Sequence, residues 1–164
     1  MVLQVHTFLF ADLVGFTRFT ARHGDERAAQ LALSVHRRVR TLAASLGCQV
    51  IKTIGDAVMV RSDDGEAAIA LARGILELVE QRSLPPVRVG LDTGPAVERD
   101  GDWFGSTVNA ASRVAGAARA GELLVTERTR AACAGTGAQL SERGARALEG
   151  LPALTLYGQA LMSR

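Results

Sequence analysis

The stretch IKTIGDAVMV, residues 51–60, decides the fold that the sequence predicts. With residues 48–50 before it, it contains two short apolar and β-branched runs around Gly55 and Asp56, a pattern typical of a β-hairpin. Most of the stretch is expected to be buried. Yet it carries Lys52 and, four residues later, Asp56, one charge of each sign. A buried hairpin with two charges calls for a reason beyond folding.

The elements on either side of the hairpin predict the order β-α-β-β-α-β. A β-branched and aromatic strand is expected over 5–14, and a long helix with Asp25 as its N-cap is expected to stop at Gly47. A second amphipathic helix over 62–82 and a strand over 86–94 complete the order. This order predicts an α+β fold with a ferredoxin-like βαββαβ core, an antiparallel sheet whose helices cover one face.

Additional strands and helices are expected after this core, and they show no linker, repeat or low-complexity segment. The sequence therefore predicts one domain over 1–164. The later elements are a hairpin over 96–104 with a tight turn at Asp100 and Gly101, a helix over 106–118, a strand and short helix over 122–135 with Thr126 as N-cap, and a strand over 154–158.

The composition excludes several classes of protein. Of 164 residues, 48% are hydrophobic, and the net charge of +2 is scattered, so neither nucleic acid nor a membrane surface is an expected partner. No signal peptide is expected, and no apolar stretch approaches the ~20 residues of a membrane span. Cys48 and Cys133 lie outside any paired motif and are expected to be buried free thiols, which fits the cytoplasm.

Two carboxylates are expected to meet at one end of the sheet. Phe8, Phe10 and Asp12 alternate along one face of the first strand, and Asp12 ends it. Asp56 lies in the hairpin turn, and the hairpin can neighbour the first strand. Such a pair suits divalent cations, which take oxygen ligands and leave a side open for phosphate. Ordinary turn and helix-capping roles for the two residues remain the alternative.

Two further features favour phosphate chemistry. The segment VGFT leads from the first strand into a helix, where free backbone N–H groups suit phosphate oxygens and Gly15 permits close approach. Asn109 and Arg113 are four residues apart and share one helical face. Arginine can stabilise charge on a transferring phosphoryl group, and asparagine can position a sugar. A merely solvated polar face remains the alternative.

Three motifs in this order resemble the catalytic domain of class III nucleotidyl cyclases, of the bacterial adenylyl cyclase type. They are FADLVGFT at 10–17, KTIGDAVM at 52–59 and DWFGSTVNAASR at 102–113. The resemblance covers nearly the whole chain and implies the same extended ferredoxin-like fold. It also implies conversion of ATP to cyclic AMP and pyrophosphate by a head-to-tail homodimer with two active sites at its interface.

The resemblance implies a role for each matched position. The ligands of two Mg²⁺ or Mn²⁺ ions per site would be Asp12, Asp56 and the carbonyl of Leu13. The phosphate cradle would be the backbone of Gly15, Phe16 and Thr17. Lys52 and Asp102 would read the base. Asn109 would hold the ribose, and Arg113 would stabilise the transition state.

Base choice and the odd charges of the hairpin then have one explanation. Adenine presents an acceptor at N1 and a donor at N6, so Lys52 and Asp102 complement it, whereas guanine presents the reverse pattern. We therefore expect ATP rather than GTP. In the family, one subunit brings the metal aspartates and the other brings the base-reading pair, so Lys52 and Asp56 would serve different active sites.

The sequence also departs from the family. Near the C-terminus the family usually has a lysine that reaches the triphosphate, and here Glu149 stands in its place. Unless Arg146 or Arg143 substitutes, ATP binding should be weaker and more dependent on metal. Asp92 stands where a histidine is common, and His6, His23 and His36 are expected to be surface or core residues with no partner beside them.

Two other functions remain open at this point. A degenerate cyclase domain would bind nucleotide or a partner and regulate another activity, and Glu149 favours this reading. Another palm-type nucleotidyl transferase would share the paired carboxylates. The helix with Asn109 and Arg113, the base-reading pair and the lack of a basic groove for a template strand argue against it.

Overall fold

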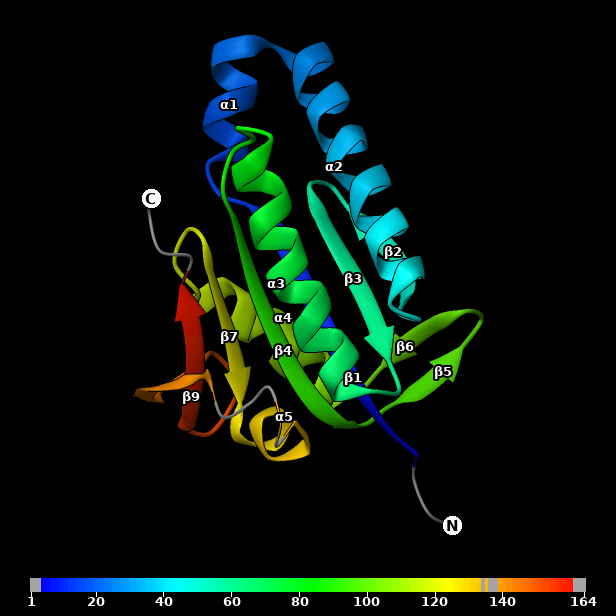
Figure 1. Ribbon diagram of the computed structural model, residues 1–164, viewed down its shortest axis with the longest axis vertical. Coiled ribbons are helices and arrows are strands. Elements are labelled where there is room, and N and C mark those ends of the chain that lie inside the picture. Colours follow the sequence, from blue (N-terminus) through cyan, green and yellow to red (C-terminus); the bar gives the residue numbers. More distant parts are fainter. Residues whose placement is uncertain (1–3, 134, 136–138, 161–164) are drawn as a thin grey trace.

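The computed structural model describes residues 4–133, 135 and 139–160 (Figure 1). The ends of the predicted domain, 1–3 and 161–164, lie outside the described residues, as does residue 134 in the predicted strand–helix segment. The helices are α1 (Phe16–His23), α2 (Asp25–Ser45), α3 (Gly65–Gln81), α4 (Ser106–Ala117) and α5 (Glu127–Ala132). The strands are β1 (Val5–Leu13), β2 (Gln49–Ile54), β3 (Ala57–Ser62), β4 (Val87–Pro95), β5 (Val97–Arg99), β6 (Asp102–Phe104), β7 (Glu122–Thr126), β8 (Ser141–Arg146) and β9 (Leu154–Ala160).

The predicted βαββαβ core is confirmed by β1, α2, β2, β3, α3 and β4. Its strands belong to a seven-stranded sheet of order β2-β3-β1-β4-β7-β9-β8. Strand β1 pairs antiparallel with both β3 and β4, as the ferredoxin-like arrangement requires. The sheet is not wholly antiparallel, because β7 joins β4 in parallel.

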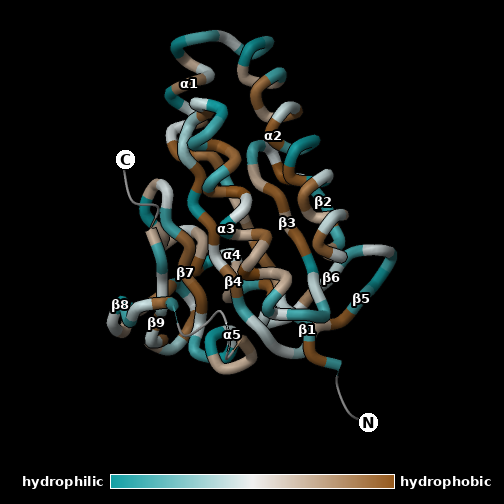
Figure 2. Tube along the Cα trace, viewed as in Figure 1, coloured by the Kyte–Doolittle hydropathy of each residue, from teal (hydrophilic) through white to brown (hydrophobic). Residues whose placement is uncertain are grey.

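Side chains of β1 alternate between two cores, one on each face of the sheet. Leu9 and Ala11 pack under α2 and α3, whereas Phe8 and Phe10 pack with Met59 against α4. In Figure 1, α2 and α3 lie in front of the sheet and α4 lies behind it. Figure 2 shows strongly hydrophobic strands, such as β3 and β7, between these layers. The prediction of helices on one face holds for α2 and α3 but is incomplete, since α4 covers the other.

Helix α4 approaches the sheet closely at one glycine of β4. A Cβ atom added to Gly90 would lie 2.0 Å from the backbone nitrogen of Ala115. Because that neighbour is helix backbone, any side chain at this position would push α4 away from the sheet. The position of α4, and of every residue on its outer face, therefore depends on Gly90.

The hairpin of β5 and β6 stands apart from the main sheet. It forms its own two-stranded sheet, and in Figure 1 it projects beyond the other strands. Its turn confirms the prediction: Asp100 (φ 54°) and Gly101 (φ 81°) both adopt positive φ, as a two-residue hairpin turn requires. Trp103 packs against the core formed by Phe8 and Phe10 and so attaches the hairpin to the sheet.

Two local expectations were wrong, and one strand was missed. The N-cap of α2 is Gly24 rather than Asp25, because α1 ends at this glycine (φ 88°) and the next helix starts directly after it. Strand β2 is the half-exposed edge of the sheet, so the side chain of Lys52 is 41% exposed rather than buried. Strand β8 was not predicted, because its mostly exposed side chains give no apolar alternation.

Both cysteines confirm the prediction: Cys48 and Cys133 are buried and free. Burial raises the pKa of the Cys133 thiol to about 11, so this thiol stays protonated and unreactive at neutral pH. No helix within the described residues combines the length and the apolar character that crossing a membrane requires.

Candidate active site

The two aspartates of the candidate metal site lie at the same end of the sheet. Asp12 is next to last in β1, and Asp56 follows Gly55 (φ 59°) in the turn between β2 and β3. The backbone N–H of Leu13 donates to Asp56 Oδ2 at 3.0 Å. The structure thus brings the carboxylate of Asp56 against the backbone that carries Asp12.

Arg88 was missed by the sequence reasoning, and it is the partner of Asp12. It lies directly opposite Asp12 in the β1–β4 register. Its Nε donates to Asp12 Oδ1 at 2.8 Å and its Nη2 donates to Oδ2 at 3.2 Å, which raises the pKa of the guanidinium. A third donor, Nη1, reaches the carbonyl of Gly116 in α4 at 3.1 Å. The antiparallel register, once drawn, was the signal that could have found this residue.

The predicted phosphate cradle forms a tight turn into α1. Gly15 adopts the left-handed conformation (φ 77°) and is the N-cap of the helix. No side chain among the described residues caps this end, so the backbone of Phe16 and Thr17 begins the helix with free N–H groups. Free N–H groups at a helix start can donate hydrogen bonds to the oxygens of an anion.

The two predicted base-reading residues contact each other within one subunit. Lys52 Nζ donates to Asp102 Oδ2 at 2.6 Å. The other oxygen, Oδ1, accepts from the backbone N–H of Trp103 at 2.8 Å. The hydrogen bond from Lys52, and secondly that from Trp103, holds the pKa of Asp102 below its usual value. Asp102 is therefore an ionised acceptor of fixed orientation at neutral pH.

The predicted polar face of α4 is exposed, and its opposite face is buried as expected. Asn109 and Arg113 are exposed on this helix, one turn apart. Nη1 of Arg113 donates to Oε2 of Glu149 at 3.3 Å. The acidic residue that replaces the family's lysine therefore contacts the arginine expected to stabilise the transition state.

Both candidate substitutes for the missing lysine have partners of their own. Nη1 of Arg146 donates to the carbonyl of Ala117 at 2.9 Å. Nε of Arg143 lies 3.6 Å from a carboxylate oxygen of the buried Glu122. Either arginine would have to leave these partners to reach a triphosphate.

The Asp102 hairpin packs toward the end of β1 opposite Asp12, while Lys52 lies at the level of Phe10 with β3 between it and β1. Trp103, which follows Asp102, stacks beside His6 and Phe8 with ring centroids 4.6 and 5.9 Å apart, respectively. Asp12 follows Phe8 by four residues, a separation of about 13 Å along an extended strand. One chain thus presents two separated polar regions.

Comparisons with known proteins identify the family of the chain. The family model described as the adenylate and guanylate cyclase catalytic domain matches residues 3–159. The chain belongs to this family. A pH-sensitive adenylate cyclase of Mycobacterium tuberculosis is 41% identical over 150 residues, which cover 88% of this chain and 38% of that protein. An adenylate cyclase of Streptomyces griseus is 39% identical over 117 residues, which cover 71% of this chain and 29% of that protein.

The cyclase domain thus spans about a third of the length of these curated relatives. Among solved structures, an adenylate cyclase from Trypanosoma brucei in its monomeric state superposes with a TM-score of 0.81 at 25% identity. The match covers 94% of this chain and 89% of that one. This likeness agrees with the ferredoxin-like core and its additional strands.

Two buried polar residues of the cyclase domain have partners that the sequence did not reveal. His6 was expected to have none, yet its Nδ1 lies 2.7 Å from Asp63 Oδ1 and 3.0 Å from Arg61 Nη1. Asp92, only 1% exposed, accepts hydrogen bonds from Thr126 and from Arg128 Nη2, both at 2.5 Å. The aspartate that stands where the family often has histidine is therefore the buried member of an ion pair with the half-exposed Arg128.

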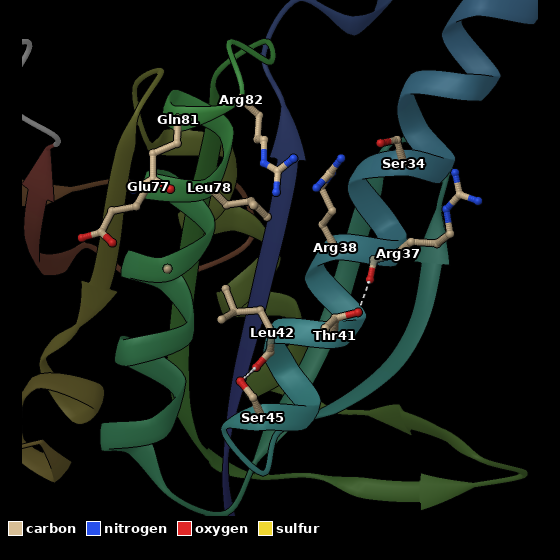
Figure 3. Close-up of a pocket in the computed structure, with 11 residues that line it drawn as sticks. Ser34, Arg37, Arg38, Thr41, Leu42, Ser45, Glu77, Leu78, Gln81 and Arg82 are labelled. Atoms are coloured by element: carbon tan, nitrogen blue, oxygen red, sulfur yellow. Dashed lines mark hydrogen bonds between the residues drawn. The ribbon is translucent and has the colours of Figure 1, made fainter.

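One groove of the cyclase domain lies away from all these residues. It has a volume of about 670 Å³ between α2 and α3. In Figure 3, Arg38 and Arg82 extend toward each other between the two helices above Leu42. It contains none of the candidate site residues and lies on the face of the sheet opposite α4, so it is not the candidate nucleotide site.

Proposed function

We propose that this chain is an adenylyl cyclase catalytic domain that converts ATP to 3′,5′-cyclic AMP and pyrophosphate. The observation that carries the proposal is the contact between Lys52 and Asp102, because a lysine donor beside an aspartate acceptor would complement N1 and the N6 amine of adenine. Membership of the cyclase family and the adenylate cyclase names of the curated relatives support it.

The proposed reaction is intramolecular. The ribose 3′-oxygen bonds to the α-phosphorus, its proton leaves, and the bond to pyrophosphate breaks. Asn109 would hold the ribose, and Arg113 would offset the charge that develops on the α-phosphate. The backbone of Gly15, Phe16 and Thr17 would bind phosphate oxygens. Both α4 residues are exposed, and therefore available to a nucleotide.

The residues at the end of β1 fit a pair of Mg²⁺ or Mn²⁺ ions. No group of three or more His, Cys, Asp or Glu residues forms a metal cluster within the described part of the chain. Magnesium bound with a nucleotide, however, takes only one or two carboxylates and completes its shell with phosphates and water. Asp12, Asp56 and the Leu13 carbonyl would supply the protein ligands. Bound there, such ions would acidify the 3′-hydroxyl and neutralise the triphosphate.

Arg88 has a defined part in this proposal. In the free subunit it neutralises Asp12 through two hydrogen bonds. When Asp12 serves as a metal ligand, the guanidinium would lose these acceptors and turn toward the triphosphate, which offers new ones. It would thereby supply positive charge that Glu149 does not.

We propose that the active sites are shared across a homodimer. The separation of the Asp102 hairpin from Asp12 along β1, and of Lys52 from β1 by the intervening β3, supports this, because each region of one chain would face the complementary region of its partner. We place the domain in the cytoplasm, where ATP is available and where its two cysteines would stay reduced.

A degenerate cyclase domain is the second candidate, and the contact between Glu149 and Arg113 favours it. Glu149 both occupies the arginine and repels the triphosphate. Such a domain would bind nucleotide or a partner without turnover.

Product formation by the purified chain, with ATP or GTP and with Mg²⁺ or Mn²⁺, distinguishes these candidates. Cyclic AMP from ATP would support the cyclase and its base preference. Folded, dimeric protein that forms no cyclic product under any of the four conditions would refute catalysis and leave the regulatory role.

A further inference from the structure

Among the described residues, the hairpin that carries Asp102 follows β4 directly but shares no ladder of backbone hydrogen bonds with the main sheet. Strands β5 and β6 pair only with each other, whereas Lys52 belongs to β2 of the seven-stranded sheet. Because no ladder of backbone hydrogen bonds fixes one relative to the other, side-chain contacts help to set the position of Asp102 against Lys52.

Trp103 makes the contacts that fix this hairpin. The guanidinium of Arg61, on β3, lies over the indole ring, 4.7 Å from its centroid. His6, on β1, meets the indole edge-on with ring centroids 4.6 Å apart, and Phe8 lies 5.9 Å away. The indole is thus held by side chains from two strands of the main sheet.

Arg61 is itself held in place by neighbours on three sides. Its Nη1 donates to Asp63 at 2.7 Å, and its Nη2 and Nε donate to Gln49 Oε1 at 2.9 and 3.2 Å. Nη1 also lies 3.0 Å from His6 Nδ1. The side chain is only 17% exposed, so a cation–π contact here is stronger than at an open surface. These bonds fix the guanidinium plane on which the indole rests.

The indole is coupled to Asp102 through the backbone. The N–H of Trp103 donates to Asp102 Oδ1 at 2.8 Å, which leaves Oδ2 for Lys52 at 2.6 Å. A movement of the indole would move this N–H, and the carboxylate would turn with it. The orientation of the base-reading carboxylate therefore depends on a stack that begins at the next residue, Trp103, and extends to Arg61.

We propose that Arg61 is a positioning residue for base selection, acting through Trp103. The stack of Arg61, Trp103 and His6 holds Asp102 in the orientation that favours adenine over guanine. This inference rests on the proposed function of Lys52 and Asp102. Arg61 need not touch the substrate, so its loss impairs discrimination between ATP and GTP more than turnover at saturating ATP.

The test is Arg61→Gln, with Arg130→Gln as the matched control. Arg130 also lies over an aromatic ring, 4.6 Å from the centroid of Tyr157, and also pairs with a carboxylate, Glu127. It lies on α5, outside the candidate site. We expect Arg61→Gln to lower the ratio of kcat/KM for ATP to that for GTP by about tenfold, the usual effect of one misplaced hydrogen bond. Arg130→Gln should leave the ratio unchanged, and Arg61→Lys, which keeps the cation, should restore part of it.

Trp103 provides a second measurement, because it is the one tryptophan of the chain. Acrylamide quenching of its fluorescence should increase in Arg61→Gln and not in Arg130→Gln. Asp63→Asn is a milder variant for use if Arg61→Gln fails to fold, since Asp63 is 59% exposed and holds Arg61 from outside the core. It should shift both readouts in the same direction by a smaller amount.

The outcomes separate this inference from the proposed function. The positioning role would be overturned if quenching of Trp103 increases while the ratio of kcat/KM for ATP to that for GTP is unchanged. An equal loss of kcat/KM for both nucleotides would also overturn it. If the unmodified chain binds ATP in preference to GTP without turnover, catalysis fails, while the ratio of the two Kd values still tests Arg61. If it shows no preference at all, the base-reading assignment and the inference fall together.

Discussion

Mixing two inactive variants should restore activity if each active site draws on both subunits. Asp12→Ala removes a metal ligand from one polar region of the chain, and Lys52→Ala removes the base donor from the other. Chains that pair at random form heterodimers in half of all dimers. Each heterodimer has one site that lacks both residues and one that is whole. The mixture should therefore recover about one quarter of the activity of the unmodified chain.

The assay is cyclic AMP production after the two variants have exchanged subunits, measured against each variant alone. The matched control mixes Asp12→Ala with Asp56→Ala. These residues lie in the same region, where the N–H of Leu13 donates to Asp56, so no pairing yields a whole site and no activity should return. Absence of rescue in the first mixture, with heterodimers shown to be present, would refute the shared site. Equal rescue in the control would refute the assignment of the two regions.

Three further predictions test α4 and the ion pair between Asp92 and Arg128. Arg113→Ala should lower kcat by about 10²–10³-fold and change the Kd for nucleotide far less, since its role would lie in the transition state; equal losses in both would contradict that role. Gly90→Ala should lower the free energy of unfolding by about 3 kcal/mol in urea denaturation, because α4 must move, whereas Gly116→Ala, which meets no atom within 4 Å, should raise it by about 0.5 kcal/mol. Arg128→Gln should lower the free energy of unfolding by about 1–2 kcal/mol in the same assay, because it leaves the Asp92 carboxylate buried without its partner. The 53% exposure of Arg128 limits the loss. An unchanged midpoint would show that the pair is dispensable.

Local sequence patterns predicted the core well, because each of its elements has a strong signal of its own. The apolar alternation of β1, the turn between β2 and β3, and the helical spacing of Ile69 and Val79 in α3 all appear in the structure as expected. The turn at Asp100 and Gly101 was readable because few residue pairs other than these accept positive φ at both positions.

The features that sequence patterns missed depend on contacts between distant segments. Strand β8 has mostly polar, exposed side chains and exists because β9 offers it an edge. The pairing of Arg88 with Asp12 needs the β1–β4 register, which no local pattern contains. The partners of His6 come from the far end of β3, and the placement of α4 on the second face depends on its contact at Gly90.

The candidate catalytic charges of the free subunit neutralise one another, and this has a consequence for the order of binding. Asp12 holds Arg88 at 2.8 Å, and Glu149 lies 3.3 Å from Arg113. In the proposed reaction, Asp12 would exchange its guanidinium for a cation, and Arg113 would exchange its carboxylate for phosphate. Arg88 becomes free to meet the triphosphate only after Asp12 has acquired another partner. Cation and nucleotide should therefore bind cooperatively. A cation that binds Asp12 frees Arg88 for the triphosphate, and a triphosphate that attracts Arg88 frees Asp12 for the cation.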